Sequence, residues 1–208
     1  MINNQLKVIE CPRDAMQGIQ TFIPTKSKID YLNKLLLCGF DTLDFGSFVS
    51  PKAIPQLSDT KEVLAGLNLD SKKTKLLAIV ANERGAEEAS GFDEINYIGF
   101  PLSVSEQFQK RNTNKSIDEA VKTLDTIQET CKKLDKTLVV YLSMGFGNPY
   151  GEAWGPELVA NWCSRLDKQL DVRIMALSDT IGCAKEEDVT YLFKHLIRRV
   201  GSILSRGN

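Results

Sequence analysis

Residues 116–142 read SIDEAVKTLDTIQETCKKLDKTLVVYL, and this stretch decides the class of fold. Ser116 with Glu119 three residues later forms a capping-box pattern, which predicts the start of a helix. Apolar residues then recur at helical spacing at Ile117, Ala120, Val121, Leu124 and Ile127. Residues 137–142 are almost continuously apolar, which is typical of a strand covered on both faces. The stretch therefore predicts a helix followed by a buried parallel strand.

The same alternation of strand and helix extends over the rest of the chain. Strand patterns begin near residues 6, 40, 75, 95, 137 and 172. Helices are expected at residues 25–38, 59–67, 83–89, 116–134, 156–166 and 186–200, with Thr25 as an N-cap. Such a repeat predicts an α/β fold with a parallel sheet. Periodicity leaves two architectures open, a doubly wound sheet and a TIM (β/α) barrel. No glycine-rich loop follows the first strand, which disfavours dinucleotide binding.

Composition restricts the classes of partner. The 208 residues carry a formal net charge of -1, so neither nucleic acid nor an anionic membrane is expected as a partner. No apolar run approaches the roughly 18 residues that span a bilayer. Five cysteines without a C-x-x-C pair predict neither a disulfide framework nor a zinc site, and a reducing cytoplasm fits them best. Cys38, Cys131 and Cys163 fall in helical patterns, so we expect them in the core.

Polar residues gather where the predicted strands end. Residues 10–17 follow the first strand, residues 44–52 the second, and residues 178–182 the sixth. Ligands of parallel α/β folds bind at the carboxyl ends of the strands. We therefore expect these segments to line one site.

Three of these segments carry a family resemblance. Pro12-Arg13-Asp14-x-x-Gln17, Ser47-Phe48-Val49-Ser50-Pro51-Lys52-x-x-Pro55-Gln56 and Asp179-Thr180-Ile181-Gly182 resemble the 3-hydroxy-3-methylglutaryl-CoA (HMG-CoA) lyase family in order and spacing. Phe108-x-x-x-Asn112 resembles a later loop, and the match covers about residues 6–195. The resemblance implies a metal-dependent TIM-barrel enzyme that cleaves HMG-CoA to acetyl-CoA and acetoacetate. That reaction is a retro-Claisen cleavage, in which the thioester fragment leaves as an enolate.

The resemblance also implies roles for single residues. Asp14 is expected to bind Mg²⁺ or Mn²⁺, which prefer oxygen ligands. Arg13 is expected to contact the substrate and to stabilise the enolate oxygen. Gln17, Ser47 and Asn112 fall where the family contacts substrate and CoA.

Two further carboxylates are expected to be catalytic. Asp44 stands where the family usually has Glu, so the carboxylate is kept but is one methylene shorter. Asp179 lies where the family has an acidic residue near the substrate hydroxyl, as a base or a supporting group. Simpler interpretations stay open: Arg13 and Asp14 as a surface ion pair, Asp44 as a satisfied buried carboxylate, and Asp179 as a helix cap.

The pattern departs from the family near its end. A TIM barrel has eight strands in about 250 residues, whereas six are predicted here. We therefore expect one partial, pyruvate carboxyltransferase-like barrel domain over residues 1–208, with an atypical tail at about 198–208. The family's His-x-His pair and its cysteine-containing glycine-rich loop do not occur, and His195 is expected to be structural. The chain alone is expected to be a weak or inactive lyase.

Two other functions remain open at this point. One is an acyl-CoA condensing enzyme of the isopropylmalate or homocitrate synthase kind. The other is a non-catalytic fragment that binds CoA or pairs with another subunit, including a second copy of itself, through open sheet edges. Each of these interpretations has an acyl-CoA as substrate or ligand, except the one in which the chain only pairs with another subunit.

Overall fold

The structure is a computed structural model that describes residues 6–69 and 73–200. It divides into two units, the first made of residues 1–99 and 130–137 and the second of residues 100–129 and 138–208. Strand β4 (Ile95–Ser103) and helix α6 (Ile117–Lys133) contribute residues to both units. The single domain predicted from the sequence stays a prediction. Most of its predicted tail, from residue 201 on, lies outside the described residues.

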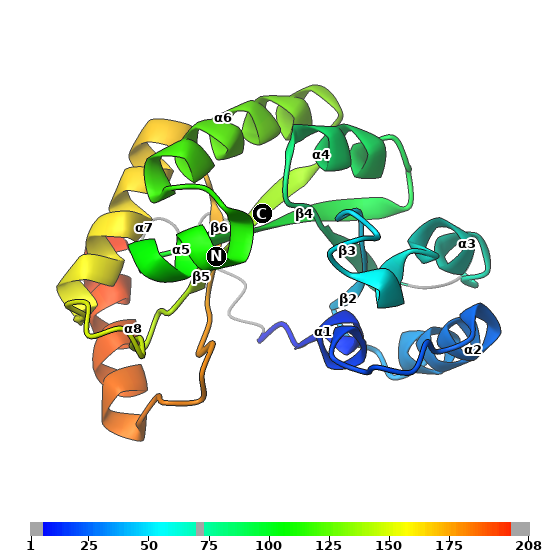
Figure 1. The fold of residues 1–208 in the computed structure, drawn as a ribbon, viewed down its shortest axis with the longest axis horizontal. Helices are drawn as coiled ribbons and strands as arrows, with labels where there is room; N and C mark the ends of the chain where they lie inside the picture. The colour runs from blue at the N-terminus through cyan, green and yellow to red at the C-terminus, as the bar shows by residue number, and fades with distance from the viewer. Residues whose placement is uncertain (1–5, 70–72, 201–208) are drawn as a thin grey trace. The chain divides into compact units, whose positions relative to one another are not determined.

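The first unit alternates strands with short helices (Figure 1). Its elements up to β4 are β1 (Ile9–Glu10), α1 (Pro12–Gln17), α2 (Thr25–Leu36), β2 (Thr42–Ser47), the 3₁₀ helix η1 (Pro55–Leu57), α3 (Thr60–Ala65), β3 (Lys75–Ile79) and α4 (Glu83–Ser90). Helices α2 and α3 pack side by side, and α1 packs against β2 and η1. The first helix is therefore held next to the end of the second strand.

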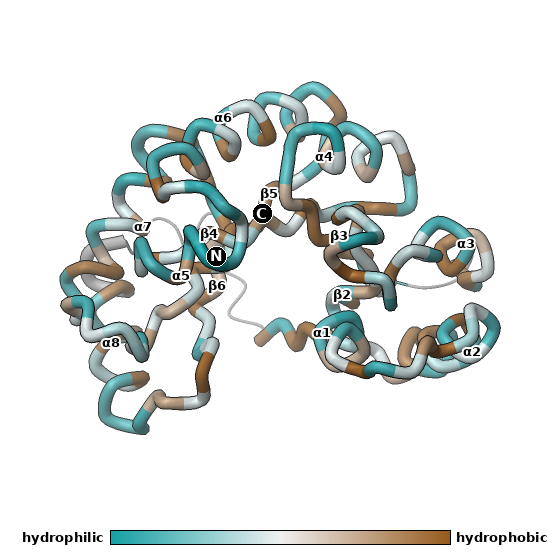
Figure 2. Tube along the Cα trace, viewed as in Figure 1, coloured by the Kyte–Doolittle hydropathy of each residue, from teal (hydrophilic) through white to brown (hydrophobic). Residues whose placement is uncertain are grey.

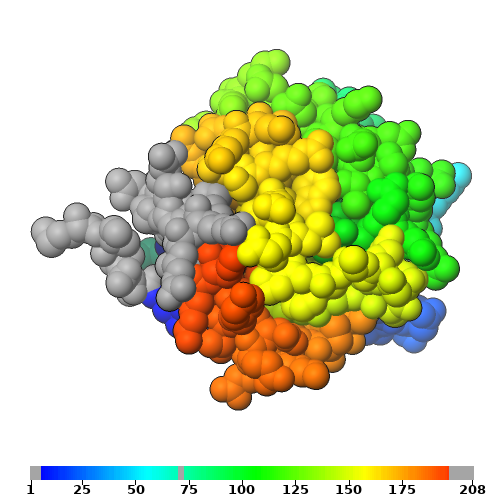
Figure 3. Space-filling view, turned by 90° about the vertical axis from the view of Figure 1, so that its left-hand side faces the viewer, coloured from blue at the N-terminus to red at the C-terminus, as the bar shows by residue number. Residues whose placement is uncertain are grey.

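The second unit repeats the pattern. Besides its share of β4 and α6 it contains α5 (Glu106–Thr113), β5 (Thr137–Ser143), α7 (Pro156–Leu170), β6 (Ile174–Leu177) and α8 (Glu186–Val200). Helix α7 packs against α8, and Figure 3 shows α7 in yellow beside the orange-red part of α8. His195 lies at this contact, with Nε2 3.1 Å from Glu157 Oε1. Its place between two helices agrees with a structural role.

The strand order separates the two architectures that the sequence left open. The strands follow one another as β1-β2-β3-β4-β5-β6. Pairing is parallel between β1 and β2, β2 and β3, β3 and β4, and β5 and β6. A doubly wound sheet reverses its strand order part-way, whereas successive strands of a TIM barrel are neighbours. The observed order is that of the barrel.

Buried apolar residues hold each unit together. All six residues of β2 are buried, and Leu32 and Leu36 of α2 are at most 3% exposed. In the second unit Leu124 and Ile127 are fully buried on α6. Figure 2 shows the same division, since the α6 trace alternates between teal and brown and β3 is mostly brown. The predicted capping box is confirmed, because Glu119 N donates to Ser116 Oγ at 3.2 Å and Ser116 N donates to Glu119 at 2.7 Å.

Some local predictions were wrong. Pro24, and not Thr25, is the N-cap of α2, and no side chain caps that helix. Cys38 is exposed because α2 ends at Leu36, whereas Cys131 and Cys163 are buried as expected. Helices α1 and α5 and the 3₁₀ helix η1 were not predicted, since their sequences hold too few apolar residues to show a helical stripe. Among the described residues no helix is long and apolar enough to cross a membrane.

Candidate functional site

Arg13 is the centre of a polar cluster at the end of β1. It is the second residue of α1, which begins at Pro12, and only 9% of Arg13 is exposed. Its Nε donates to Asp44 Oδ1 at 3.1 Å, and its Nη2 donates to Asp44 Oδ2 at 2.6 Å. Two parallel bonds between a guanidinium and a carboxylate fix the plane of both groups. The pair therefore sets the orientation of Arg13.

Asp44 is fully buried in β2, where the register against β3 shifts between Asp44 and Gly46. Irregularities of this kind re-aim a strand side chain. Burial raises the pKa of Asp44, and the hydrogen bonds and positive charge of Arg13 oppose that rise. Because both of its oxygens accept from Arg13, the Asp44 carboxylate holds the guanidinium in place.

The other edge of the guanidinium faces Asp14 and Gln17. Arg13 Nη1 donates to Asp14 Oδ1 at 2.9 Å and to Gln17 Oε1 at 3.1 Å. Gln17 Nε2 also donates to Asp14 Oδ1 at 3.3 Å. The Asp14 side chain is 66% exposed, in contrast to the buried Asp44. Arg13 thus has one buried, fixed edge and one edge on the accessible side of the cluster.

Cys11 adjoins this cluster at the end of β1. It is partly buried, and burial, followed by the charge of Asp44, raises the pKa of its thiol to about 11. A thiol with so high a pKa is protonated near neutral pH and is a poor nucleophile. Cys11 is therefore an apolar neighbour of the cluster and not a reactive group.

A second buried network secures the loop that follows α1, and sequence reasoning missed it. Lys28 is 1% exposed; its Nζ donates to the carbonyl oxygen of Gln56 and, at 2.6 Å, to Asp59 Oδ1. The ammonium also lies 4.1 Å from the centroid of the Phe22 ring. The Gln56 side chain binds the backbone of Ile19, Thr21 and Ile23 with three hydrogen bonds of 2.8–2.9 Å. The Pro55-Gln56 pair in the sequence motif was the available signal.

Ser47 uses its hydroxyl for local structure. The hydroxyl donates to the carbonyl oxygen of Ile79 at 3.3 Å and accepts from Val49 N at 3.2 Å. The residue is 4% exposed. Its hydroxyl thus shapes the loop after β2.

Two predicted site residues belong to the second unit. Asn112 lies exposed in the last turn of α5. Asp179 follows β6, and its two oxygens accept from Cys183 N at 2.9 Å and Ala184 N at 3.0 Å. These backbone bonds lower the pKa of Asp179. Asp179 is therefore an ionised residue that organises the loop before α8.

The described residues do not by themselves fit a divalent cation. Within them, no group of three or more His, Cys, Asp or Glu side chains is arranged to hold a metal ion. Asp14 offers an exposed carboxylate, whereas Mg²⁺ takes about six oxygen ligands.

Comparison with known proteins identifies a family for the chain. A profile of the HMGL-like family matches residues 7–205. The chain belongs to the HMGL-like family. Hydroxymethylglutaryl-CoA lyase YngG of Bacillus subtilis (strain 168) is 33% identical over 190 residues, which are 90% of this chain and 62% of that protein. The chain spans 52–62% of the length of the first curated relatives it matches.

Solved structures of the family share the fold. The Bacillus subtilis HMG-CoA lyase superposes with a TM-score of 0.87 at 31% identity, over 95% of this chain and 66% of that one. An Acinetobacter baumannii HMG-CoA lyase in complex with coenzyme A and 3-methylmalate gives 0.85 at 29% identity, over 93% and 62%. Together with the strand order, these matches confirm the predicted incomplete TIM barrel. The family resemblance read from the sequence is confirmed too. The roles of single residues stay predictions.

Proposed function

We propose that this protein is a carbon–carbon lyase of the HMG-CoA lyase type, acting on HMG-CoA or a related 3-hydroxy-3-alkylglutaryl-CoA. The observation that carries the proposal is the preorganised Arg13–Asp44 pair in a chain of the HMGL-like family. A structural relative at 29% identity holds coenzyme A and 3-methylmalate, a small hydroxy acid, which supports an acyl-CoA substrate. The weak activity expected of this chain alone stays a prediction.

Arg13 is proposed to stabilise the enolate oxygen that develops as the carbon–carbon bond breaks. Its charge is already oriented by Asp44, so little reorganisation is needed during the reaction. The Nη1 edge, now bonded to Asp14 and Gln17, is the edge that a substrate oxygen would approach. Gln17 would then exchange its bond to Arg13 for one to the substrate. Removing such a donor typically costs about 10²–10³ in kcat.

Asp14 is proposed as one ligand of Mg²⁺ or Mn²⁺, since the HMGL-like family is in general metal-dependent and the carboxylate is exposed. Such a cation supplies Lewis-acid polarisation of the substrate's hydroxyl and carboxylate oxygens when bound. Asp14 alone does not make this site. Asp14 Oδ1 accepts from Arg13 Nη1 at 2.9 Å, which supports a cation site beside the proposed enolate donor.

Asp179, Asn112 and Ser47 are proposed as supporting residues. The lowered pKa of Asp179 makes it a weak base at neutral pH, so an orienting or electrostatic role suits it better than proton abstraction. Asn112 is exposed and able to meet CoA. Ser47 acts through the loop that its hydroxyl holds. A cytoplasmic location is proposed because all five cysteines are free thiols.

The test is a turnover assay on the purified chain with HMG-CoA and Mg²⁺ or Mn²⁺. We expect slow release of acetyl-CoA and acetoacetate that Arg13→Met abolishes. The matched control is Arg173→Met, which replaces an exposed arginine of the second unit and should leave the rate of cleavage unchanged. Condensation of acetyl-CoA with a 2-oxo acid, with no cleavage, would assign the chain to the condensing enzymes instead. Turnover that survives Arg13→Met would overturn the proposal.

A further inference from the structure

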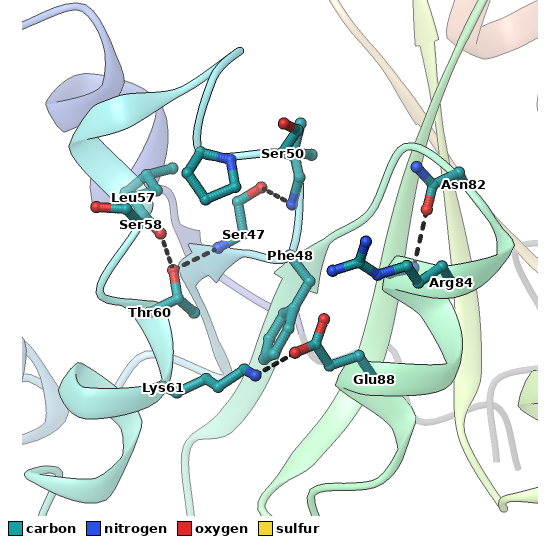
Figure 4. A pocket seen from close by; sticks show the side chains of 13 residues that line it. Ser47, Phe48, Ser50, Leu57, Ser58, Thr60, Lys61, Asn82, Arg84 and Glu88 are labelled. Carbon is teal, nitrogen blue, oxygen red and sulfur yellow. Dashed lines mark hydrogen bonds and ion pairs between the residues drawn. The ribbon is translucent and has the colours of Figure 1, made fainter.

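A pocket of about 300 Å³ lies in the first unit, where the loop after β2 faces α3 and α4 (Figure 4). Its polar lining includes Ser50, Ser58, Lys61, Asn82, Arg84 and Glu88. This volume is at the lower end of the range for small-molecule sites, so the pocket suits a small ligand. None of these six side chains belongs to the Arg13 cluster.

The walls of the pocket approach each other closely. A Cβ atom on Gly85 would lie 2.7 Å from the carbonyl oxygen of Phe48, so only glycine lets α4 come this near to the loop. On the opposite wall, Thr60 Oγ1 accepts from Ser47 N at 3.2 Å and donates to the carbonyl oxygen of Leu57 at 2.8 Å. Both walls are thus fixed by backbone contacts, and the pocket is formed before any ligand arrives.

The polar atoms left over in the pocket are mainly donors. Asn82 Oδ1 accepts from Gly85 N at 2.9 Å, which leaves the Asn82 NH₂ group to donate. Ser50 Oγ accepts from Lys52 N at 3.3 Å, which leaves its O–H. The carboxylate of Glu88, the one acid in the lining, is paired with Lys61. A ligand that only accepts hydrogen bonds matches this set.

Arg84 adds a positive charge to the lining. Figure 4 shows its guanidinium extending from α4 toward the middle of the pocket. Within residues 6–69 and 73–200 its side chain makes no hydrogen bond or ion pair. With Lys61 and Glu88 cancelling, the lining carries a net positive charge. Arginine next to hydroxyl and amide donors is the combination that binds phosphate oxygens.

We propose that this pocket binds a phosphate group, with Arg84 as the principal contact and Asn82 and Ser50 as neutral donors. The phosphate is either free or part of a larger molecule such as a nucleotide. The proposal does not depend on the lyase activity, because none of the proposed catalytic residues donates to this ligand.

The test is a titration of the ¹⁵N-labelled 208-residue chain with inorganic phosphate at constant ionic strength. We expect saturable shifts confined to the amides of residues 48–50, 58–61 and 82–88. Arg84→Met should weaken binding about tenfold or more, because it removes a charge-assisted hydrogen bond. Glu88→Gln should tighten binding, because it releases Lys61 from its ion pair. Arg173→Met is the control and should bind like the native chain.

The outcomes separate the sources of the phosphate. If CoA displaces inorganic phosphate and 3′-dephospho-CoA does not, the pocket binds the 3′-phosphate of CoA. If neither compound displaces inorganic phosphate, the pocket binds a phosphate from another source. Arg84 is exposed, so the variant should melt at the native temperature without phosphate. Linear, unsaturable shifts, or equal affinity of Arg84→Met and the native chain, would overturn the proposal.

Discussion

Replacing Asp44 by Asn should destabilise the protein far more than the same change at Asp14. Both carboxylates bind the guanidinium of Arg13, but Asp44 is fully buried and binds with two oxygens, whereas Asp14 is 66% exposed and binds with one. Asp44→Asn leaves the charge of Arg13, itself 9% exposed, without its buried counter-charge. Removing one partner of a buried pair costs about 3–5 kcal/mol. An asparagine oxygen still accepts one bond, so about 3 kcal/mol is expected.

The assay is urea unfolding followed by circular dichroism, with thermal melts as a second measure. About 3 kcal/mol corresponds to a fall of roughly 6–12 °C in Tm for a chain of this size. Asp14→Asn is the matched control, and loss of an exposed ion pair should cost at most about 1 kcal/mol. Adding Arg13→Met to Asp44→Asn should recover part of the loss, because the charge that lost its buried counter-charge is then gone. Equal costs for the two single variants would refute the claim that the buried edge fixes Arg13.

Three further outcomes follow from the structure. Lys28→Met should cost about 3 kcal/mol in urea unfolding, because Asp59 loses its buried partner, whereas Lys26→Met on the exposed face of α2 should cost little. Ser116→Ala should lower the free energy of unfolding by about 1 kcal/mol, because it removes the cap of α6. The control Ser27→Ala, at an exposed position of α2, should leave the free energy of unfolding unchanged. Burial raises the pKa of the Cys131 and Cys163 thiols to about 12 from 9.0, so their contribution to stability is complete below pH 9 and is lost as the pH rises toward 12. At pH 8 iodoacetamide should therefore label Cys38 and not Cys131 or Cys163, and mass spectrometry measures the labelling of each thiol. Rapid labelling of either buried thiol in the folded chain would contradict their burial.

The alternation of strands and helices was predictable because it depends on neighbours within one segment. The 116–142 stretch carries its own start signal, its apolar stripe and the strand that follows, and all three are present in the structure. Helix α1 was not predictable in this way, because its sequence, PRDAMQ, shows no apolar stripe at helical spacing. Pro12 and packing against β2 set its first turn. The contact between them includes the Arg13–Asp44 bonds, whose two residues are 31 positions apart in the sequence.

The Arg13 cluster was predictable as two segments, residues 10–17 and 44–52, but not as a set of contacts. Resemblance brought Arg13, Asp14 and Asp44 into one hypothesis, and the structure places them in one hydrogen-bonded cluster. It gave no sign that both oxygens of Asp44 bind Arg13. Nor did it indicate that Lys28 is buried, since a lysine on an amphipathic helix is usually solvated. Contacts of this kind depend on which distant backbone the side chain meets.

The most direct test of the central claim is turnover by a chimera. In it, residues 7–177 of this chain replace the matching segment of the Bacillus subtilis lyase YngG. If these residues carry the proposed lyase chemistry, the chimera should release acetyl-CoA and acetoacetate from HMG-CoA, and Arg13→Lys should lower kcat about 10²-fold, because lysine cannot make the bidentate bonds to Asp44. A folded chimera without lyase activity, or one indifferent to Arg13→Lys, would contradict the account.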